Sequence, residues 1–413
     1  MNLRTILTTS IVLLLTGVAQ ADVLIQNVKV VTADNTQGSV TDVLIEGDSI
    51  SQLGDSISVS KDTKTIDGTG KTLTAGFFNA HTQLGLTEVG AVSDTVDDSS
   101  VNARITASLR VSDAINPSSV LLPHNRMLGL THALVQPNAN VGIFAGTAAI
   151  IQLSESGTIK VSDAAMVMKL GSHGKLVAGG SRAAAMAQLR EAVEDARDYA
   201  NNKDGFNRGN RRDYALSRHD LQALIPMVSG KMPLIVHVDR AVDIERIIDF
   251  TKANNIRLIV AGAEEGWRVA DKLAANKIPV IIDPINNLPS SYDTLGSRLD
   301  NAKILDEAGV TILLTGMSWH NTHNAYLVRQ SAGNAVANGL SYATAIKSLT
   351  STPAKVFGLK NLGEVKAGAH ANLVLWSGDP LETSTIVEKV LINGLDQPLV
   401  SRATRLRDRY FVN

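Results

Sequence analysis

The chain has 413 residues, of which 44% are hydrophobic and 19% are charged, values typical of a globular protein rather than a disordered one. Its 39 Lys and Arg residues balance 40 Asp and Glu residues, which leaves a formal net charge of -1. Because there is no basic excess to neutralise phosphates, nucleic acid is a poor candidate partner. The lack of cysteine in the sequence excludes disulfides, thiolate metal sites and a nucleophilic cysteine.

Residues 1–21 have the pattern of a secretory signal peptide. Arg4 provides a basic start, residues 11–18 form a short apolar run, and the stretch ends in Ala19-Gln20-Ala21. This pattern predicts cleavage before Asp22. An uncleaved anchor is the alternative, which the shortness of the apolar run disfavours. We therefore expect export to a bacterial periplasm, where disulfides are permitted but not required, and no membrane attachment after cleavage.

Both ends of the mature chain are rich in predicted strands. Residues 23–74 contain short β-branched runs separated by Asp, Asn and Gly turns. Residues 371–376 and 387–392 repeat this pattern near the C-terminus. We predict a single β-sandwich assembled from both termini, residues 22–75 and 364–413.

The middle of the chain, residues 76–363, alternates predicted strands and helices. The strands are expected at 233–238, 256–260, 278–282 and 310–315, and the helices at 243–251 with Asp243 as N-cap, 266–276, 298–308 and 324–338. Such alternation predicts parallel strands joined by right-handed crossovers, with room for eight units. The predicted fold is therefore an α/β protein with a (β/α)8 TIM barrel. An open doubly wound sheet is the alternative, but no G-x-G-x-x-G follows a strand.

Two segments are expected to lie outside the regular barrel units. Apolar residues at helical spacing from Met186 to Ala200 predict an amphipathic helix, and the polar residues 201–213 after it predict a solvated loop. Residues 90–104, rich in Asp and Ser, predict a flexible loop near the barrel mouth.

The entry to the barrel carries a motif. Residues 73–85 read Leu-Thr-Ala-Gly-Phe-Phe-Asn-Ala-His-Thr-Gln-Leu-Gly. This stretch resembles the P-G-F-I-D-A-H-S-H-x-G entry of the amidohydrolase superfamily, in particular its secreted imidazolonepropionase- and prolidase-like branch. Further similar stretches cover essentially the whole mature chain, at residues 129–137, 146, 233–237, 265–266, 352–355 and 363–380. The resemblance implies the barrel fold and hydrolysis of C–N bonds in amide, cyclic amide or dipeptide substrates.

The resemblance also implies a divalent metal site, which must be matched residue by residue. Family members use an H-x-H pair after strand one, histidines after strands five and six, and in many cases a carboxylated Lys after strand four. His81 and His237 match two of the histidines, Gln83 stands at the second position of the pair, and Lys169 matches the lysine. If the chain is active, we expect one zinc or manganese ion on these four residues, although Gln is a far weaker ligand than His. The alternative is that both histidines are hydrogen-bonded in a polar pocket without a metal.

The other expected groups are missing. Gly262 or a neighbour stands at the strand-six histidine, and Gly316 or Met317 at the strand-eight Asp, which serves the family as general base. The candidate substitutes are Asp283 and His320 as catalytic groups, and Asp239, Arg240 and His323 as substrate-binding groups. The alternative for Asp283 is that it is a turn residue. The alternative for His320 and His323 is that they are ordinary loop residues.

Two classes of function therefore remain open. The first is a periplasmic hydrolase of C–N bonds that acts through a reduced site. The second is a non-catalytic relative that keeps the pocket for binding or assembly, because a fold alone does not confer activity. Both classes predict a small-molecule or dipeptide-like ligand. A homo-oligomer through the outer barrel helices is expected on base rates only.

Overall fold

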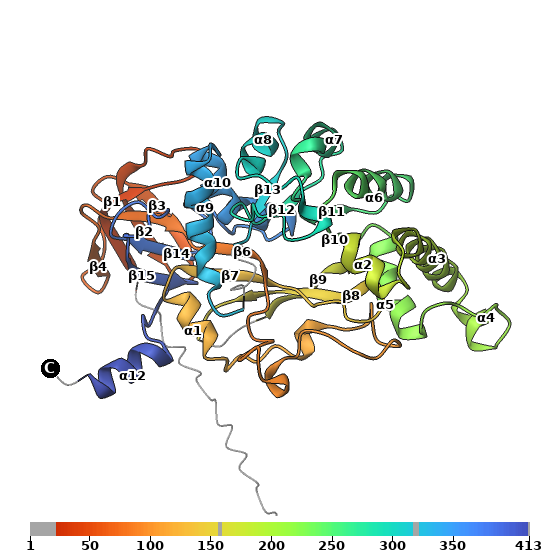
Figure 1. The fold of residues 1–413 in the computed structure, drawn as a ribbon. Coiled ribbons are helices and arrows are strands. Elements are labelled where there is room, and N and C mark those ends of the chain that lie inside the picture. The colour runs from red at the N-terminus through yellow and green to blue at the C-terminus, as the bar shows by residue number, and fades with distance from the viewer. Residues whose placement is uncertain (1–21, 156–158, 317–321, 412–413) are drawn as a thin grey trace, which may run out of the picture.

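The computed structural model describes residues 22–155, 159–316 and 322–411, and their strands form two eight-stranded sheets (Figure 1). The first sheet contains β1 (Val23–Val30), β2 (Ser39–Glu46), β3 (Ser49–Gly54), β4 (Lys64–Asp67), β5 (Thr72–Ala75), β14 (Leu373–Trp376), β15 (Val387–Ile392) and β16 (Leu395–Gln397). Its strand order is β16-β15-β14-β5-β1-β2-β3, with β4 paired to β1. Antiparallel pairing of β5 with β14, in which Leu73 lies opposite Leu375, joins the two ends of the chain. The prediction of one β domain built from both termini is confirmed.

The second sheet curls into the barrel. It contains β6 (Phe77–Thr82), β7 (Leu130–Val135), β8 (Phe144–Gln152), β9 (Ile159–Lys169), β10 (Leu234–Val238), β11 (Leu258–Gly262), β12 (Val280–Ile282) and β13 (Ile312–Leu314), in sequence order across the sheet. Just after β13, Thr315 Oγ1 donates to the His81 carbonyl oxygen at 3.1 Å and to Asn79 Oδ1 at 2.9 Å. These bonds link the two edge strands, so that the sheet is nearly closed and the barrel prediction is confirmed.

One strand departs from the expected parallel arrangement. β8 is antiparallel to both β7 and β9, whereas the other seven strands are parallel to one another. β8 begins at Phe144, soon after β7 ends, and β9 begins at Ile159, soon after β8 ends. A parallel neighbour needs a crossover of a dozen or more residues, so these short connections require antiparallel pairing. The expectation of eight parallel units is therefore wrong at β8.

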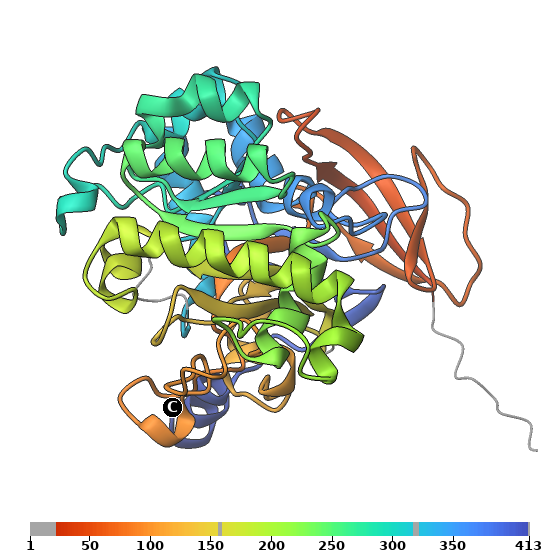
Figure 2. The same ribbon diagram turned by 90° about the vertical axis from the view of Figure 1, so that its right-hand side faces the viewer.

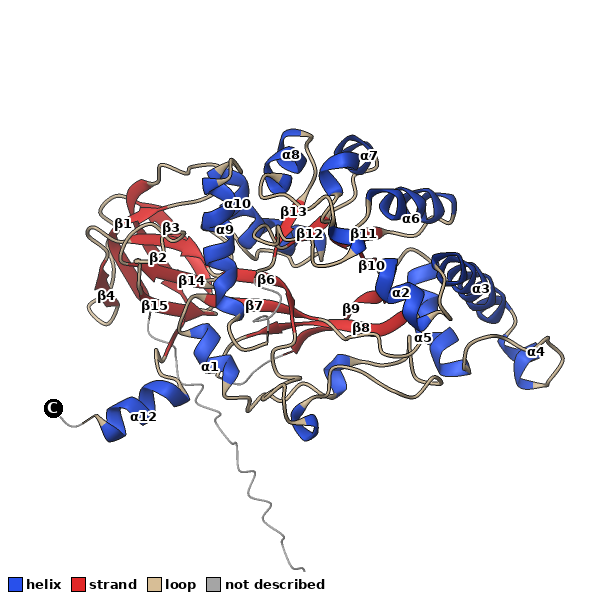
Figure 3. Cartoon of the chain, in the orientation of Figure 1, coloured by secondary structure: helices blue, strands red, loops and turns tan. Residues whose placement is uncertain are grey.

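Helices cover the outer face of the barrel, as the turned view shows (Figure 2). They are α2 (Gly171–Val177), α3 (Arg182–Asn201), α4 (Lys203–Asn207), α5 (Arg218–Val228), α6 (Ala241–Ala253), α7 (Ala270–Ala275), α8 (Asn301–Glu307), α9 (Val328–Ala337), α10 (Tyr342–Leu349) and α11 (Ser351–Val356). α1 (Leu121–Arg126) follows β6 after a long segment that is almost entirely loop (Figure 3). α12 (Arg402–Tyr410) contacts α1 at the edge of the molecule. No helix among the described residues is long and apolar enough to cross a membrane.

The start of α6 differs from its prediction. The helix begins at Ala241 with Arg240 as its N-cap residue, so that Asp243 lies inside the first turn instead of capping it. Asp243 is buried and pairs with Arg182, Arg240 and Arg246. A carboxylate in the first turn is favoured by the helix dipole, and here it also gathers three guanidinium groups.

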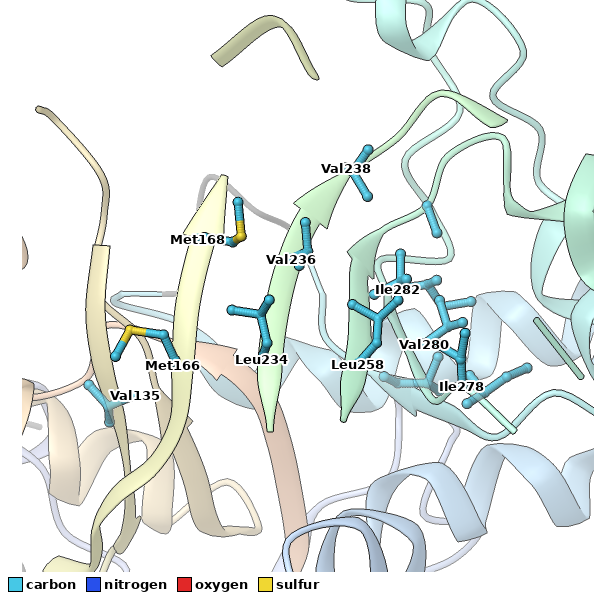
Figure 4. Close-up of a cluster of buried hydrophobic side chains, with 14 of the residues drawn as sticks. Val135, Met166, Met168, Leu234, Val236, Val238, Leu258, Ile278, Val280 and Ile282 are labelled. Atoms are coloured by element: carbon cyan, nitrogen blue, oxygen red, sulfur yellow. The ribbon is translucent and has the colours of Figure 1, made fainter. Parts of the chain in front are cut away.

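The barrel strands have two different faces. Leu234, Val236 and Val238 of β10 point outward into the core beneath the helices (Figure 4), while Ile235 belongs to the core inside the barrel. Because successive side chains on a strand alternate between the two faces, His237 shares the inner face with Ile235. The strand pattern thus directs His237 into the barrel.

The polar stretch after α3 is more structured than a solvated loop. Residues 203–207 form α4, and Asp195 of α3, with no exposed surface, accepts from Arg212 Nη2 at 2.5 Å and from the Ala215 amide at 2.9 Å. Residues 207–213 are exposed, as expected for a solvated loop, but the short helix α4 and the contact of Arg212 with the buried Asp195 carboxylate were not predicted.

Candidate active site

Four polar side chains meet at the carboxyl ends of β6, β7, β9 and β10. Lys169 is the last residue of β9 and lies in register with His237 of β10. The imidazole rings of His81 and His237 lie edge to face, with their centroids 4.9 Å apart. Gln136, directly after β7, places its Oε1 2.9 Å from His237 Nε2. The carboxyl ends of the strands are where a barrel of this kind holds its functional groups.

The hydrogen bonds of Gln136 fix the proton on His237. Gln136 Nε2 donates to the Ala80 carbonyl oxygen at 2.9 Å, so its Oε1 is the atom that accepts from His237 Nε2. His237 therefore carries its proton on Nε2 and keeps its lone pair on Nδ1. This tautomer leaves Nε2 unable to bind a metal ion in this arrangement.

Lys169 is held by a relay that begins in the loop before β7. Its Nζ donates to Asn138 Oδ1 at 3.0 Å, and Asn138 Nδ2 donates to Asp98 Oδ2 at 2.5 Å. Asp98 is buried and belongs to the Asp- and Ser-rich segment predicted near the barrel mouth. The amide of Asn138 thus separates the cation from its nearest acid, and the ammonium faces the histidines without a directly bonded carboxylate among the described residues.

Electrostatics keep both histidines neutral. Burial, followed by the positive charge of Lys169, lowers the pKa of His81 to about 4. Burial also lowers the pKa of His237 well below its usual value, with His81 and Lys169 contributing in that order. Burial lowers the pKa of Lys169 as well, while Asp98 opposes that shift. At neutral pH the cluster therefore holds two neutral imidazoles, each with a basic nitrogen.

The barrel layer that contains these residues is polar on one side only. Strand register places Lys169, His237, Ala261, Ile281 and Leu313 at one level from β9 to β13. The last three side chains are buried and belong to the apolar core inside the barrel. No further metal ligand is therefore offered at this level by β11, β12 or β13.

Packing explains the two glycines that replace expected ligands. A Cβ at Gly262, whose φ is +87°, would lie 2.3 Å from Asp239 Oδ1. A Cβ at Gly316 would lie 2.2 Å from Ser331 Oγ of α9. Both distances are far shorter than a van der Waals contact, so a larger residue requires the neighbour to move.

The described residues do not fit the divalent metal that the fold family implies. Protein zinc sites use three or four ligands, but no group of three or more His, Asp or Glu side chains in the described ranges is arranged to hold a metal ion. Gln83 does not complete the set, because its Oε1 accepts from Thr322 Oγ1 at 3.1 Å. Lys169 adds a positive charge beside the two imidazoles, which opposes a second cation.

The remaining candidates have local partners. Arg240 makes a bidentate ion pair with Asp243, with both bonds at 3.0 Å, and its guanidinium lies 5.8 Å from the Tyr292 ring. His323 Nε2 lies 3.0 Å from the Glu88 carbonyl oxygen. Asp283 Oδ1 accepts weakly from the Ile285 amide at 3.4 Å. His320 lies outside the described residues.

Sequence reasoning missed Gln136, Asn138 and Glu264. The first two follow β7, and their position after a barrel strand was a usable signal.

Glu264 follows β11 and is only 5% exposed, with Oε1 accepting from Asn286 Nδ2 at 2.7 Å. Burial, followed by the charge of nearby Asp239, raises the pKa of Glu264 to about 8. Burial likewise raises the pKa of Asp239 to about 6. Asp239 and Glu264 thus form a second group of titratable side chains at this end of the barrel, with carboxyl groups in place of imidazoles.

Known proteins share this architecture. A family model described as Amidohydrolase family matches residues 187–395, about half of the chain. The curated relative Amidohydrolase tasK of Hapsidospora irregularis is 23% identical in an alignment 406 residues long, and the alignment covers 87% of this chain. The alignment covers 40% of that relative, so the chain spans about two fifths of its length.

Solved structures show the same fold. An amidohydrolase from Thermotoga maritima MSB8 superposes with a TM-score of 0.81 at 23% identity, covering 92% of this chain and 100% of that one. A prolidase complexed with N-methylphosphonate-L-proline gives a TM-score of 0.54 at 16% identity, with the same coverage. At these identities the likeness establishes the fold alone.

Proposed function

Because the chain belongs to the amidohydrolase family, we propose that it hydrolyses C–N bonds in amide, cyclic amide or dipeptide-like substrates. The observation that carries the proposal is the pair of neutral imidazoles beside Lys169 at the carboxyl end of the barrel. A neutral imidazole accepts a proton, and a fixed ammonium stabilises negative charge on oxygen.

These residues provide a route that needs no metal. His237 Nδ1 takes a proton from water as the water oxygen bonds to the amide carbon. Lys169 Nζ donates a hydrogen bond to the carbonyl oxygen as it becomes anionic. When the C–N bond breaks, the imidazolium returns the proton to the leaving nitrogen, which yields an acid and an amine. Because the pKa of the imidazole is far below neutrality, it is a weak base and turnover is expected to be slow.

A second candidate function is binding without catalysis. It is favoured by one observation, the packing at Gly262 and Gly316 that fills the places of expected catalytic groups. In that case Lys169 and the two histidines recognise an amide-bearing ligand, which the neutral imidazoles and the ammonium hydrogen-bond without cleaving.

The two functions separate in one experiment on residues 22–413. Purified protein is assayed against a dipeptide and cyclic amide panel with and without chelator, alongside Lys169→Met, His237→Gln and the exposed control His219→Gln. Slow turnover that survives chelation, and is lost in the first two variants only, supports the hydrolase. Saturable binding without turnover supports the binding protein. One zinc or manganese per chain that is lost in His81→Ala contradicts the metal-free route.

We also propose that residues 1–21 direct export to the periplasm and are removed. The proposal is supported by the first strand, which begins at Val23, and by the Asp22 carbonyl oxygen, which accepts from the Lys64 amide at 2.8 Å. The first described strand thus begins directly after the expected cleavage position. Fractionation of bacteria that express the full chain should recover protein with Asp22 at its N-terminus in the periplasm. Recovery of an uncut chain in the membrane fraction would support the anchor instead.

A further inference from the structure

A cavity of about 420 Å³ opens at the end of the barrel opposite the histidines. Pro233, Leu258 and Pro279 line it, and they lie at the starts of β10, β11 and β12, whereas His237 lies near the end of β10. The ends of α6 and α7 and the end of α11 complete its wall. The volume falls within the range of small-molecule sites, about 300–1,000 Å³. This cavity is therefore separate from the candidate active site.

The floor of the cavity is apolar. Ile248, Ile256, Ile278 and Val356 line it together with Leu258. Leu258 and Ile278 lie near the beginnings of their strands in Figure 4. Such a floor favours a ligand with a hydrocarbon or similarly apolar body, because burying apolar surface removes it from water.

The rim of the cavity is basic. Lys252, Arg257 and Lys277 line it, all three are exposed, and no Asp or Glu does so. None of the three forms an ion pair with a carboxylate of the described residues, although many other basic side chains of the protein do. Three unneutralised cations around one opening favour an anionic group.

Lys277 adds an independent observation. It follows α7 with a φ of +53°, a left-handed conformation at the end of a helix. The equivalent positions between a helix and the next barrel strand are Gly230 before β10, Asn255 before β11 and Gly309 before β13, with φ values of +73°, +54° and +81° respectively. Glycine and asparagine are the residues that tolerate this conformation, whereas lysine is disfavoured. A lysine is therefore present where local backbone energetics favour glycine, which is consistent with use of its charge.

We propose that this cavity binds a small amphipathic carboxylate. The apolar body lies on the floor, and the carboxylate lies among Lys252, Arg257 and Lys277. Free fatty acids and hydrophobic N-acyl amino acids share this chemistry. The proposal is independent of any activity at the barrel mouth.

Calorimetric titration of residues 22–413 tests the proposal with octanoate and N-acetyl-L-leucinate as the two kinds of carboxylate. Octanol and acetate each lack one of the two required features. We expect single-site binding of at least one carboxylate, with octanol and acetate weaker by about tenfold or more, equivalent to about 1.4 kcal/mol. The tighter of the two carboxylates identifies the source of the ligand.

Two variants and a control sharpen the test. Arg257→Gln should weaken carboxylate binding by about tenfold, since it removes one of the three charges. Lys277→Gly should also weaken binding but leave the melting temperature unchanged or higher, because glycine suits the left-handed backbone. Lys61→Gln, an exposed lysine of the other domain, should change neither property. Equal affinity for octanol and octanoate, carboxylate binding unaffected by both rim variants, or no saturable binding would overturn the proposal.

Discussion

The carboxylate of Asp239 lies over Gly262, so close that a Cβ at Gly262 would stand 2.3 Å from Asp239 Oδ1. The residue after β10 thus fills the space into which a side chain at the end of β11 would project. A histidine at Gly262 and a carboxylate at Asp239 in its present position exclude each other on steric grounds. Loss of the strand-six ligand is therefore a feature of the packing and not of one residue alone.

Substitution of either close-packed glycine should destabilise the fold. Gly262→Ala and Gly316→Ala should each lower the free energy of unfolding by about 1–3 kcal/mol, because each Cβ forces a neighbour to move. Urea denaturation measures the change. Gly90→Ala is the control, since Gly90 has open space around it and an ordinary φ. Glycine variants as stable as the wild type would mean that Asp239 and Ser331 move freely, and the steric explanation would fail.

Glu264 should make the protein less stable at alkaline pH. Its pKa is raised from 4.5 to about 8, so between these values the folded chain keeps a proton that the unfolded chain has lost. The free energy of unfolding therefore falls as pH rises through this window. Glu264→Gln removes the titration, and its stability relative to the wild type should rise by about 4 kcal/mol from pH 4.5 to pH 8.

Urea midpoints across this pH range test the Glu264 prediction. Glu307→Gln is the matched control, because the Glu307 side chain is 64% exposed and pairs only across the surface with Lys303. Parallel pH profiles for wild type and Glu264→Gln would show that Glu264 ionises normally in the folded state.

His132 should have the opposite effect at acid pH. It is a buried residue of β7, where Nδ1 lies 3.0 Å from Thr131 Oγ1 and Nε2 lies 3.3 Å from Gln152 Nε2. Burial, followed by Lys160 and His370, lowers its pKa from 6.5 to about 3. Between these values the unfolded chain binds a proton that the folded chain does not, so stability is lost as pH falls below 6.5.

His132→Gln should be less stable than the wild type at pH 7 but lose about 2 kcal/mol less on going to pH 5. Chemical denaturation at both values checks this, with the exposed His219→Gln as control. An unchanged difference between the two pH values would contradict a neutral, buried His132.

Several features were predictable because they depend on local pattern. Alternating apolar residues direct His237 into the barrel, and the strand that ends at Lys169 follows from its apolar run. β8 was not predictable from strand–helix alternation, because a hairpin has no crossover helix to mark it. The Asp98–Asn138–Lys169 relay depends on contacts between distant parts of the chain, and the space over Gly262 is visible only when Asp239 is in place.

The segment after α3, which the sequence predicted as a solvated loop, provides the last prediction, because Arg212 within it pairs with a buried carboxylate. Asp195 has no exposed surface, and Arg212 and the Ala215 amide both donate to it. Asp195→Asn keeps the shape but removes the charge that Arg212 pairs with, and it should cost about 2–3 kcal/mol of unfolding free energy. Residues 203–213 should also become more sensitive to trypsin.

Glu194→Gln is the matched control. Glu194 contacts the same Arg212 at 3.5 Å, but its side chain is 78% exposed, so the substitution should change the free energy of unfolding little. Equal effects of the two substitutions would mean that the buried carboxylate does not anchor this segment.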